Sequence, residues 1–145
     1  MKRLTNLLLV IFGALVLSGC ATGPKYETVR DSLPPLNADQ GRIFFYRLSV
    51  FFGDGLQPEI KLNGEVIGTS QPGGFFFVDR APGDYEVVIA TETDKRLSFT
   101  LAANQVRYVK QSISMGVIVG RVVPSLVNEG TGMAELPGLS YTGQL

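Results

Sequence analysis

From residue 41 onward, short runs of β-branched and aromatic residues alternate with turns rich in glycine, proline and asparagine. Turn signals recur about every 8–12 residues without a sustained helical period, which is typical of a sandwich or open barrel of antiparallel strands. We therefore expect an all-β domain, an antiparallel β-sandwich or open barrel of about seven or eight short strands. The runs that predict strands cover residues 41–50, 59–62, 65–68, 75–79, 85–91, 96–101, 106–113 and 115–123.

Two turns in the middle of this domain have a clear physical basis. Asn63-Gly64 separates two strand-like runs, and this dipeptide is a strong short-range signal for a β-hairpin because both residues tolerate positive φ. Pro82-Gly83 is suited to a second tight turn. Tyr85 follows that turn directly, so we predict a corner tyrosine whose hydroxyl binds the nearby main chain.

The C-terminal part of the pattern is less regular. The apolar run 115–123 contains Gly116 and Gly120, and we interpret it as a strand with a bulge that ends before Pro124. The same glycines have the spacing of a helix-dimer motif, but the run is too short for a membrane span. The remaining residues, 125–145, predict coil with at most one short helix near 129–136.

The N-terminus has a different character. Lys2 and Arg3 precede the uninterrupted apolar run Leu7–Leu17. Eleven residues extend only about 16 Å as a helix, roughly half the hydrocarbon thickness of a bilayer. This segment therefore predicts a signal helix and not a membrane span.

The signal helix ends in Leu17-Ser18-Gly19-Cys20. This tetrapeptide resembles the lipobox of bacterial lipoproteins. The resemblance implies that the thiol of Cys20 receives a diacylglyceryl group, that the peptidase recognises Leu17, Ser18 and Gly19 and cuts before Cys20, and that the new amino terminus is acylated with a fatty acid such as palmitate. Ala21, in place of aspartate, implies sorting to the inner leaflet of the outer membrane, facing the periplasm. A buried thiol in an uncleaved helix is the alternative.

These features divide the chain into three parts. Residues 1–19 are the predicted signal peptide, and residues 20–40 are the predicted lipidated N-terminus with a flexible tether, because the segment is polar and contains three prolines. A short helix after Tyr26 is possible there until Pro34 and Pro35 stop it. Residues 41–145 form the single predicted β-domain.

Two further resemblances concern this domain. Residues 62–68 and 81–87 resemble PEGA-type and carboxypeptidase-regulatory-like β-sandwich modules, which implies a non-catalytic module on a cell envelope. The lipobox, together with the Asn63-Gly64 hairpin and the runs 41–47, 73–77 and 119–124, resembles a family of bacterial lipoproteins with a domain of unknown function. That second resemblance implies a location and a fold but no activity.

Composition excludes several kinds of chemistry. The chain has 13 basic and 13 acidic residues, no histidine and one cysteine. A balanced charge gives no electrostatic reason to expect nucleic-acid binding, and Ser-His-Asp catalysis and Cys/His zinc sites lack their residues. We expect no cofactor, no metal and no catalytic residue. A carboxylate pair among Asp54, Glu59, Asp79 and Glu92 stays open, because glycoside hydrolysis needs only two acids.

Phenylalanine is unusually clustered. Seven of the nine phenylalanines lie in 44–77, as two doublets and one triplet. Adjacent strand residues face opposite sides, so either both faces of these strands are covered, or some rings form a patch for a partner or for the lipid surface. The candidate patch residues are Phe51, Phe52, Phe75 and Phe76, of which Phe51 and Phe52 are the best placed because they lie in a glycine-rich loop.

The function predicted from the sequence is therefore a membrane-anchored periplasmic lipoprotein with a binding or scaffolding role in the cell envelope. Its expected partners are the membrane, through acyl chains on Cys20, and an envelope protein or peptidoglycan. The alternatives are a small carboxylate-dependent hydrolase of cell-wall glycans, which requires two converging acids, and a lipid carrier, which requires a hollow apolar cavity between the sheets.

Overall fold

The computed structural model describes residues 20–143. The predicted signal helix and the residues Leu17, Ser18 and Gly19 of the lipobox lie outside the described residues. Within 20–143, no helix has the length and apolar character that crossing a membrane requires.

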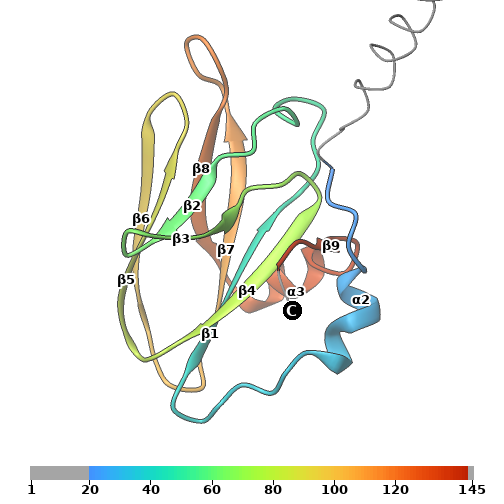
Figure 1. The fold of residues 1–145 in the computed structure, drawn as a ribbon, viewed down its shortest axis with the longest axis vertical. Coiled ribbons are helices and arrows are strands. Elements are labelled where there is room, and N and C mark those ends of the chain that lie inside the picture. The colour runs from blue at the N-terminus through green and yellow to red at the C-terminus, as the bar shows by residue number, and fades with distance from the viewer. Residues whose placement is uncertain (1–19, 144–145) are drawn as a thin grey trace, which may run out of the picture.

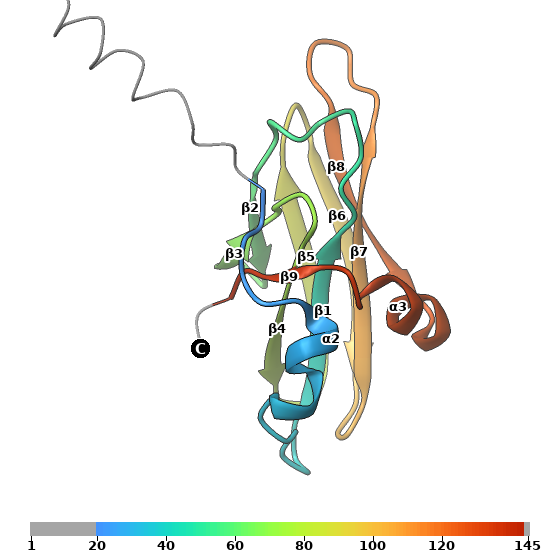
Figure 2. The same cartoon turned by 90° about the vertical axis from the view of Figure 1, so that its right-hand side faces the viewer.

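Nine strands form two stacked sheets in the described part of the chain (Figures 1 and 2). The first sheet has the order β8-β7-β1-β4-β9, and the second has the order β3-β2-β5-β6. The strands are β1 (Gly41–Arg47), β2 (Glu59–Leu62), β3 (Glu65–Thr69), β4 (Gly74–Arg80), β5 (Gly83–Ala90), β6 (Asp94–Leu101), β7 (Val106–Ser114), β8 (Arg121–Val127) and β9 (Ser140–Tyr141). The helical elements are α2 (Tyr26–Val29), the 3₁₀ turn η1 (Arg30–Ser32) and α3 (Glu129–Glu135).

The predicted all-β sandwich is confirmed, and the sheets do not close into a barrel. The expectation of purely antiparallel pairing is wrong for the first sheet. In that sheet β1 pairs with β7 in parallel, and β4 pairs with β9 in parallel. After β4 the chain forms β5 and β6 in the second sheet. It then returns to the first sheet as β7, which lies on the side of β1 opposite to β4 and runs in the same direction as β1.

The centre of the first sheet is buried on both of its faces. Every residue of β1 is buried. On the face toward the second sheet, Phe45 stacks on Phe76 with ring centroids 5.1 Å apart. The tip of the Phe76 ring reaches Gly68 of β3, where a Cβ atom would lie only 2.8 Å from it. Aromatic rings therefore fill the space between the two sheets.

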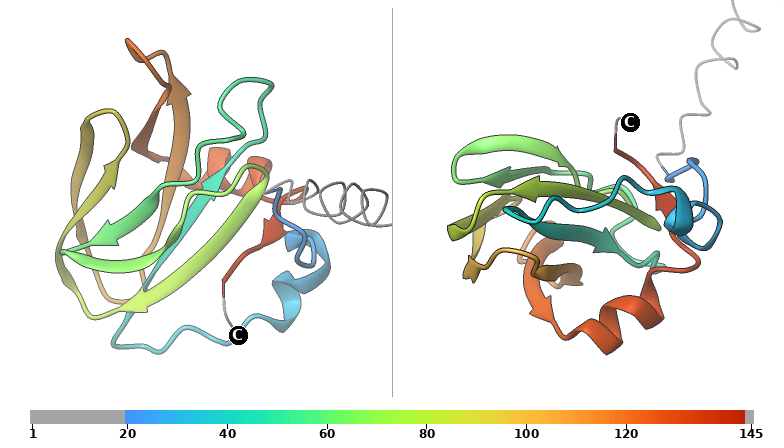
Figure 3. Two further views of the ribbon diagram at one scale, coloured as in Figure 1. Left: turned by 45° about the horizontal axis from the view of Figure 1, so that its top comes forward. Right: turned by 90° about the horizontal axis from the view of Figure 1, so that it is seen from below.

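The opposite face is covered by segments from both ends of the chain (Figure 3). Tyr26 of α2 packs edge-on against Phe44 and Phe75, with centroids 6.0 and 5.3 Å apart. Phe44 also stacks on Tyr108 of β7, and Gly132 of α3 lies against the Tyr108 ring. The reading in which both faces of the phenylalanine-rich strands are covered is therefore correct. The N-terminal segment is a part of the cover that the sequence did not predict.

The expectation of a flexible tether over 20–40 differs from the structure. The Tyr26 amide donates to the Leu139 carbonyl, and Lys25 forms a β-bridge with Ser140. Farther along, Arg42 donates to the Pro34 carbonyl at 2.7 Å. A polar, proline-rich composition is typical of a linker, but here the few apolar side chains of the segment have a matching aromatic surface to pack on.

The predicted strand over 115–123 is also wrong in its first half. Residues 115–120 form a loop, and β8 begins at Arg121 and continues through Pro124 to Val127. Proline is tolerated there because β8 is an edge strand and needs no hydrogen-bond donor on its outer side. The predicted helix near 129–136 is confirmed as α3, and the Asn128 side chain caps it by accepting from the Thr131 amide.

The predicted Asn63-Gly64 hairpin is confirmed, whereas the second predicted turn is a bend at Pro82. Asn63 and Gly64 join β2 to β3 with φ of 48° and 85°, the conformation expected for this hairpin. Gly83 is already the first residue of β5, where it pairs with Leu101, and its φ of 158° is close to extended. The Tyr85 hydroxyl donates to the Ala81 carbonyl at 2.6 Å, which is the corner arrangement predicted for it.

Candidate functional site

Exposed apolar side chains gather at one end of the sandwich. Seven of the ten large hydrophobic residues that are exposed among residues 20–143 lie in two loops there, 48–58 and 115–120. We call this surface the apolar end, and its residues are Val50, Phe51, Phe52, Met115, Val117, Ile118 and Val119. The exposed fractions reach 93% for Phe51, 94% for Met115 and 87% for Ile118. Clusters of this kind mark contact sites for proteins or membranes.

The loop 48–58 is organised by one buried cation. Arg47, the last residue of β1, is 1% exposed, and its guanidinium donates to the carbonyls of Gly53, Leu56 and Ser70. Burial lowers the pKa of Arg47, whereas the neighbouring charge of Asp54 raises it. Because the main chain of the loop is bound from inside, the rings of Phe51 and Phe52 remain on the outside, packed edge-on against each other with centroids 5.2 Å apart.

The loop 115–120 is organised in the opposite sense, by one anion. The carboxylate of Glu92, in the turn between β5 and β6, accepts from the amides of Val117 and Ile118 at 2.9 and 3.3 Å. Arg121 forms an ion pair with the same carboxylate at 3.4 Å. Gly116 permits this approach, since a Cβ there would collide with Glu92 and with the Val119 carbonyl.

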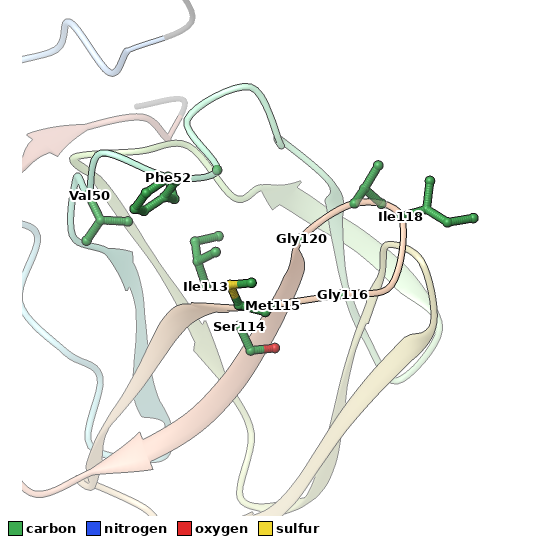
Figure 4. Close-up of a pocket in the computed structure, with 10 residues that line it drawn as sticks. Val50, Phe52, Ile113, Ser114, Met115, Gly116, Ile118 and Gly120 are labelled. Carbon is green, nitrogen blue, oxygen red and sulfur yellow. The ribbon is translucent and has the colours of Figure 1, made fainter.

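The two loops lie side by side and enclose a shallow groove of about 520 Å³ (Figure 4). Gly53 and Gly120 set the spacing, because a Cβ at Gly53 would lie 3.1 Å from Ile113 and one at Gly120 would lie 3.0 Å from Leu56. Val50 and Phe52 line one side of the groove, and Ile113 and Met115 line the other. The lining is therefore apolar and offers surface for hydrocarbon or for apolar side chains.

Cys20 is exposed and begins the described part of the chain. The next residue already touches the body of the domain, because the Ala21 amide donates to the Pro72 carbonyl at 3.4 Å. The start of the described chain lies toward the end of the sandwich that carries the loops 48–58 and 115–120 (Figures 1 and 2).

The four candidate patch phenylalanines separate into two groups. Phe51 and Phe52 are exposed, as the patch hypothesis requires. Phe75 and Phe76 are 0% and 5% exposed, so their assignment to an exposed patch is wrong. They lie in β4, whose two faces are covered by the second sheet and by α2, whereas a loop at the end of the sandwich has no such cover.

The loop 115–120 was missed because its apolar residues favour a strand. Gly116 and Gly120 within six residues were the signal that could have identified it, and the same kind of signal, Gly53 and Gly55, identified the loop 48–58. The organising role of Glu92 has no local signature, since it binds amides 25 and 26 residues away. Arg47 binds the loop that follows it directly, but nothing in the sequence of β1 distinguishes its side chain as buried.

The candidate acids are largely engaged in structural contacts. Arg42 binds Asp79 through two hydrogen bonds of 2.7 and 2.8 Å, and Glu92 holds the loop 115–120 as described. Asp54 lies near Arg47, and Glu59 is exposed on β2. Among residues 20–143, no group of three or more histidine, cysteine, aspartate or glutamate side chains is placed to hold a metal ion.

One further polar cluster lies beneath α3. Glu135 accepts from the Tyr46 hydroxyl at 2.5 Å and from the Lys110 ammonium at 2.6 Å. Burial raises the pKa of Glu135, but the hydrogen bonds from Lys110 and Tyr46 and the charge of Lys110 outweigh it, so the net pKa is lowered. Burial and the neighbouring carboxylate raise the pKa of Tyr46. This cluster fixes α3 on the first sheet.

The fold and this surface define a small β-sandwich module with an exposed apolar end. A family model described as "Protein of unknown function (DUF2846)" matches residues 37–122. The chain therefore belongs to this family, which agrees with the resemblance to a domain of unknown function. An uncharacterised protein of Haemophilus influenzae is 26% identical over 137 residues, covering 90% of this chain and 80% of the relative. The resemblance to PEGA-type modules stays a prediction.

Proposed function

We propose that the protein is a lipoprotein, anchored by acyl chains on Cys20, whose β-sandwich has a non-catalytic binding or scaffolding role in the cell envelope. The observation that carries the anchor is the sequence Leu17-Ser18-Gly19-Cys20 directly after an apolar run. The exposed thiol of Cys20, one residue before the first bonded residue of the domain, is compatible with modification there. Two or three acyl chains give stable anchoring, whereas one chain is marginal.

A binding role is supported by the apolar end, because water-exposed aromatic and aliphatic side chains on an organised loop surface favour contact with another apolar surface. The alternative, a glycan hydrolase, requires two acids that converge on a substrate. Asp79 and Glu92 are instead each bound to an arginine. We therefore place binding ahead of catalysis in the proposal.

The anchor is tested by metabolic labelling with palmitate in a bacterial host. The full chain should take up label and shift to the mature size, and globomycin should leave the unprocessed precursor. The variant C20S should take up no label, whereas T22S, two residues away, should be processed normally. Normal processing in globomycin, or palmitate label on C20S, would contradict the lipoprotein assignment.

The location is tested separately by membrane fractionation. The resemblance of Cys20-Ala21 to outer-membrane lipoproteins leads us to expect the mature protein in the outer membrane fraction of a Gram-negative host, facing the periplasm. Substitution A21D should retain it in the inner membrane. Equal distribution of both forms would contradict the proposed sorting but not the anchor itself.

A further inference from the structure

The distance between the proposed anchor and the folded domain is short. Ala21 is bonded to Pro72, and the Tyr141 amide donates to the Pro24 carbonyl at 2.9 Å. An extended chain spans at most about 3.3–3.6 Å per residue. With Ala21 bound, acyl chains on Cys20 therefore hold the domain directly against the headgroups and do not leave it free to move at a distance from the membrane.

The point of attachment also determines which part of the domain faces the membrane. The turn that binds Ala21 lies next to the loop 48–58, since a Cβ at Gly73 would lie 3.7 Å from Cβ of Ser49. A Cβ at Gly74 of the same turn would lie 3.1 Å from the Ala21 side chain. The described chain, which begins at Cys20, therefore starts beside the loop 48–58 of the apolar end.

We propose that the apolar end inserts into the same leaflet that holds the acyl chains of Cys20, with Phe51, Phe52, Val117 and Ile118 entering the boundary between headgroups and acyl chains. This inference rests on the proposed lipidation. It identifies the bilayer itself as the surface that the apolar end binds, and it gives the domain one fixed orientation on the membrane.

The chemistry of the two loops fits a lipid surface. Asp54 is the only ionisable residue in 48–58 and 115–120, and it is half-buried, with its charge near that of Arg47. Polar main-chain groups are costly to bring into hydrocarbon unless they are bonded within the protein. Arg47 binds loop carbonyls, and Glu92 binds loop amides, so part of this requirement is met before insertion. Insertion is therefore driven by apolar area and does not depend on ionic strength.

The chain contains no tryptophan, so a single introduced indole reports its own surroundings. The test uses the processed, lipidated protein, residues 20–145, in vesicles of phosphatidylethanolamine and phosphatidylglycerol, with and without brominated acyl chains. The reporting variants are F52W and I118W, one in each loop. The matched control is M133W, because Met133 is exposed on α3, away from the two loops.

In F52W and I118W, brominated lipid should quench most of the emission, and acrylamide should quench it several-fold less than in M133W. Raising the salt concentration should leave both differences unchanged. If the indoles at 52 and 118 respond to acrylamide and brominated lipid as the control does, the proposed insertion is wrong. An apolar end that binds an envelope protein and not the bilayer would give this result.

Failure of the proposed function has a different signature. If Cys20 carries no lipid, the protein takes up no palmitate and does not float with vesicles, and both proposals are overturned. If the protein is labelled and floats but the indoles stay accessible to acrylamide, the lipoprotein proposal stands and only the inserted orientation is lost.

Discussion

Phe45 and Phe52 are the same residue type, seven positions apart, with opposite environments. Phe45 is 0% exposed in β1 and stacks on Phe76, whereas Phe52 is 76% exposed in the loop 48–58. The strand is covered on both faces, whereas no such cover lies over the rings of Phe51 and Phe52 in the loop 48–58. Burial of a phenylalanine doublet is therefore decided by the layers around it and not by the doublet itself.

The largest loss of stability should come from removing the buried ring of Phe45. The variant F45A removes a fully buried ring between the sheets and should lower the free energy of unfolding by about 3–5 kcal/mol. Urea denaturation measures it, with V66A on β3, where Val66 is half exposed, as the control. A loss no larger than that of V66A would show that the space between the sheets repacks freely.

The side chain of Arg47 in β1 binds the main chain of the exposed loop 48–58, and the variant R47M removes these hydrogen bonds. The carbonyls of Gly53, Leu56 and Ser70 would lose a charged donor, and we expect a loss of about 2–3 kcal/mol. Proteolysis should then start within 48–58, as mass spectrometry of the fragments would reveal. Unchanged stability together with an intact loop would mean that Arg47 does not organise the apolar end.

Two glycines of α3 test how this helix packs on the face of the first sheet that is turned away from the second sheet. In G132A the new Cβ would press on the Tyr108 ring, where it would lie 2.4 Å from Cδ1, and overpacking should cost about 1–3 kcal/mol. In G130A the nearest atom is 3.4 Å away, and the better helix propensity of alanine should stabilise the domain by about 0.5–1 kcal/mol. Thermal unfolding of both variants tests the opposite signs, and equal signs would contradict the packing of α3.

Glu135, which lies on the same face, makes the stability of the domain depend on pH. Its pKa in the folded state lies below the ordinary value, so it stabilises the domain above that ordinary value, and this contribution is lost as the pH falls through the lowered pKa. The variant E135Q should lose about 1–2 kcal/mol at neutral pH. It should also show a flatter decline in stability in acid than the parent protein. An unchanged acid profile would show that Glu135 is not held by Tyr46 and Lys110.

The smallest effect on stability should come from the exposed rings of Phe51 and Phe52. In the double variant F51S/F52S, the free energy of unfolding should stay within about 0.5 kcal/mol of the parent value, because surface substitutions away from buried contacts cost little. Urea denaturation in parallel with F45A checks this directly. A loss comparable to that of F45A would mean that the two rings are core residues, and the apolar end would lose its main aromatic component.

The features that follow from short-range chemistry were predictable from the sequence. The Asn63-Gly64 hairpin and the Tyr85 corner each depend on residues within four positions of one another, and both have the expected geometry. The features that depend on distant partners were not predictable in this way. Tyr26 finds its place on Phe44 and Phe75, and the two residues of β9 pair with β4 only because the rest of the fold is in place.

In the candidate site too, features with a local cause were predictable from the sequence, and features with distant partners were not. The exposure of Phe51 and Phe52 follows from their glycine-rich loop. In residues 115–120, the high apolar content outweighed the glycine signal, because a strand pattern does not reveal that Glu92 binds the amides of this segment. Arg47 is a strand residue in the predicted pattern as in the structure, but its burial depends on carbonyls from two segments, the loop 48–58 and Ser70, which no strand pattern reveals.

If the protein is exported and lipidated as proposed, the bridge between Lys25 and Ser140 implies an order of events. A chain that crosses a membrane with its N-terminus first presents Cys20 to the lipid-transferring enzymes long before Ser140 emerges. At that moment the segment after Cys20 still lacks its C-terminal partner and is free of the domain. Under the proposed lipidation, anchoring therefore comes first, and arrival of the last residues then draws the domain down onto the membrane.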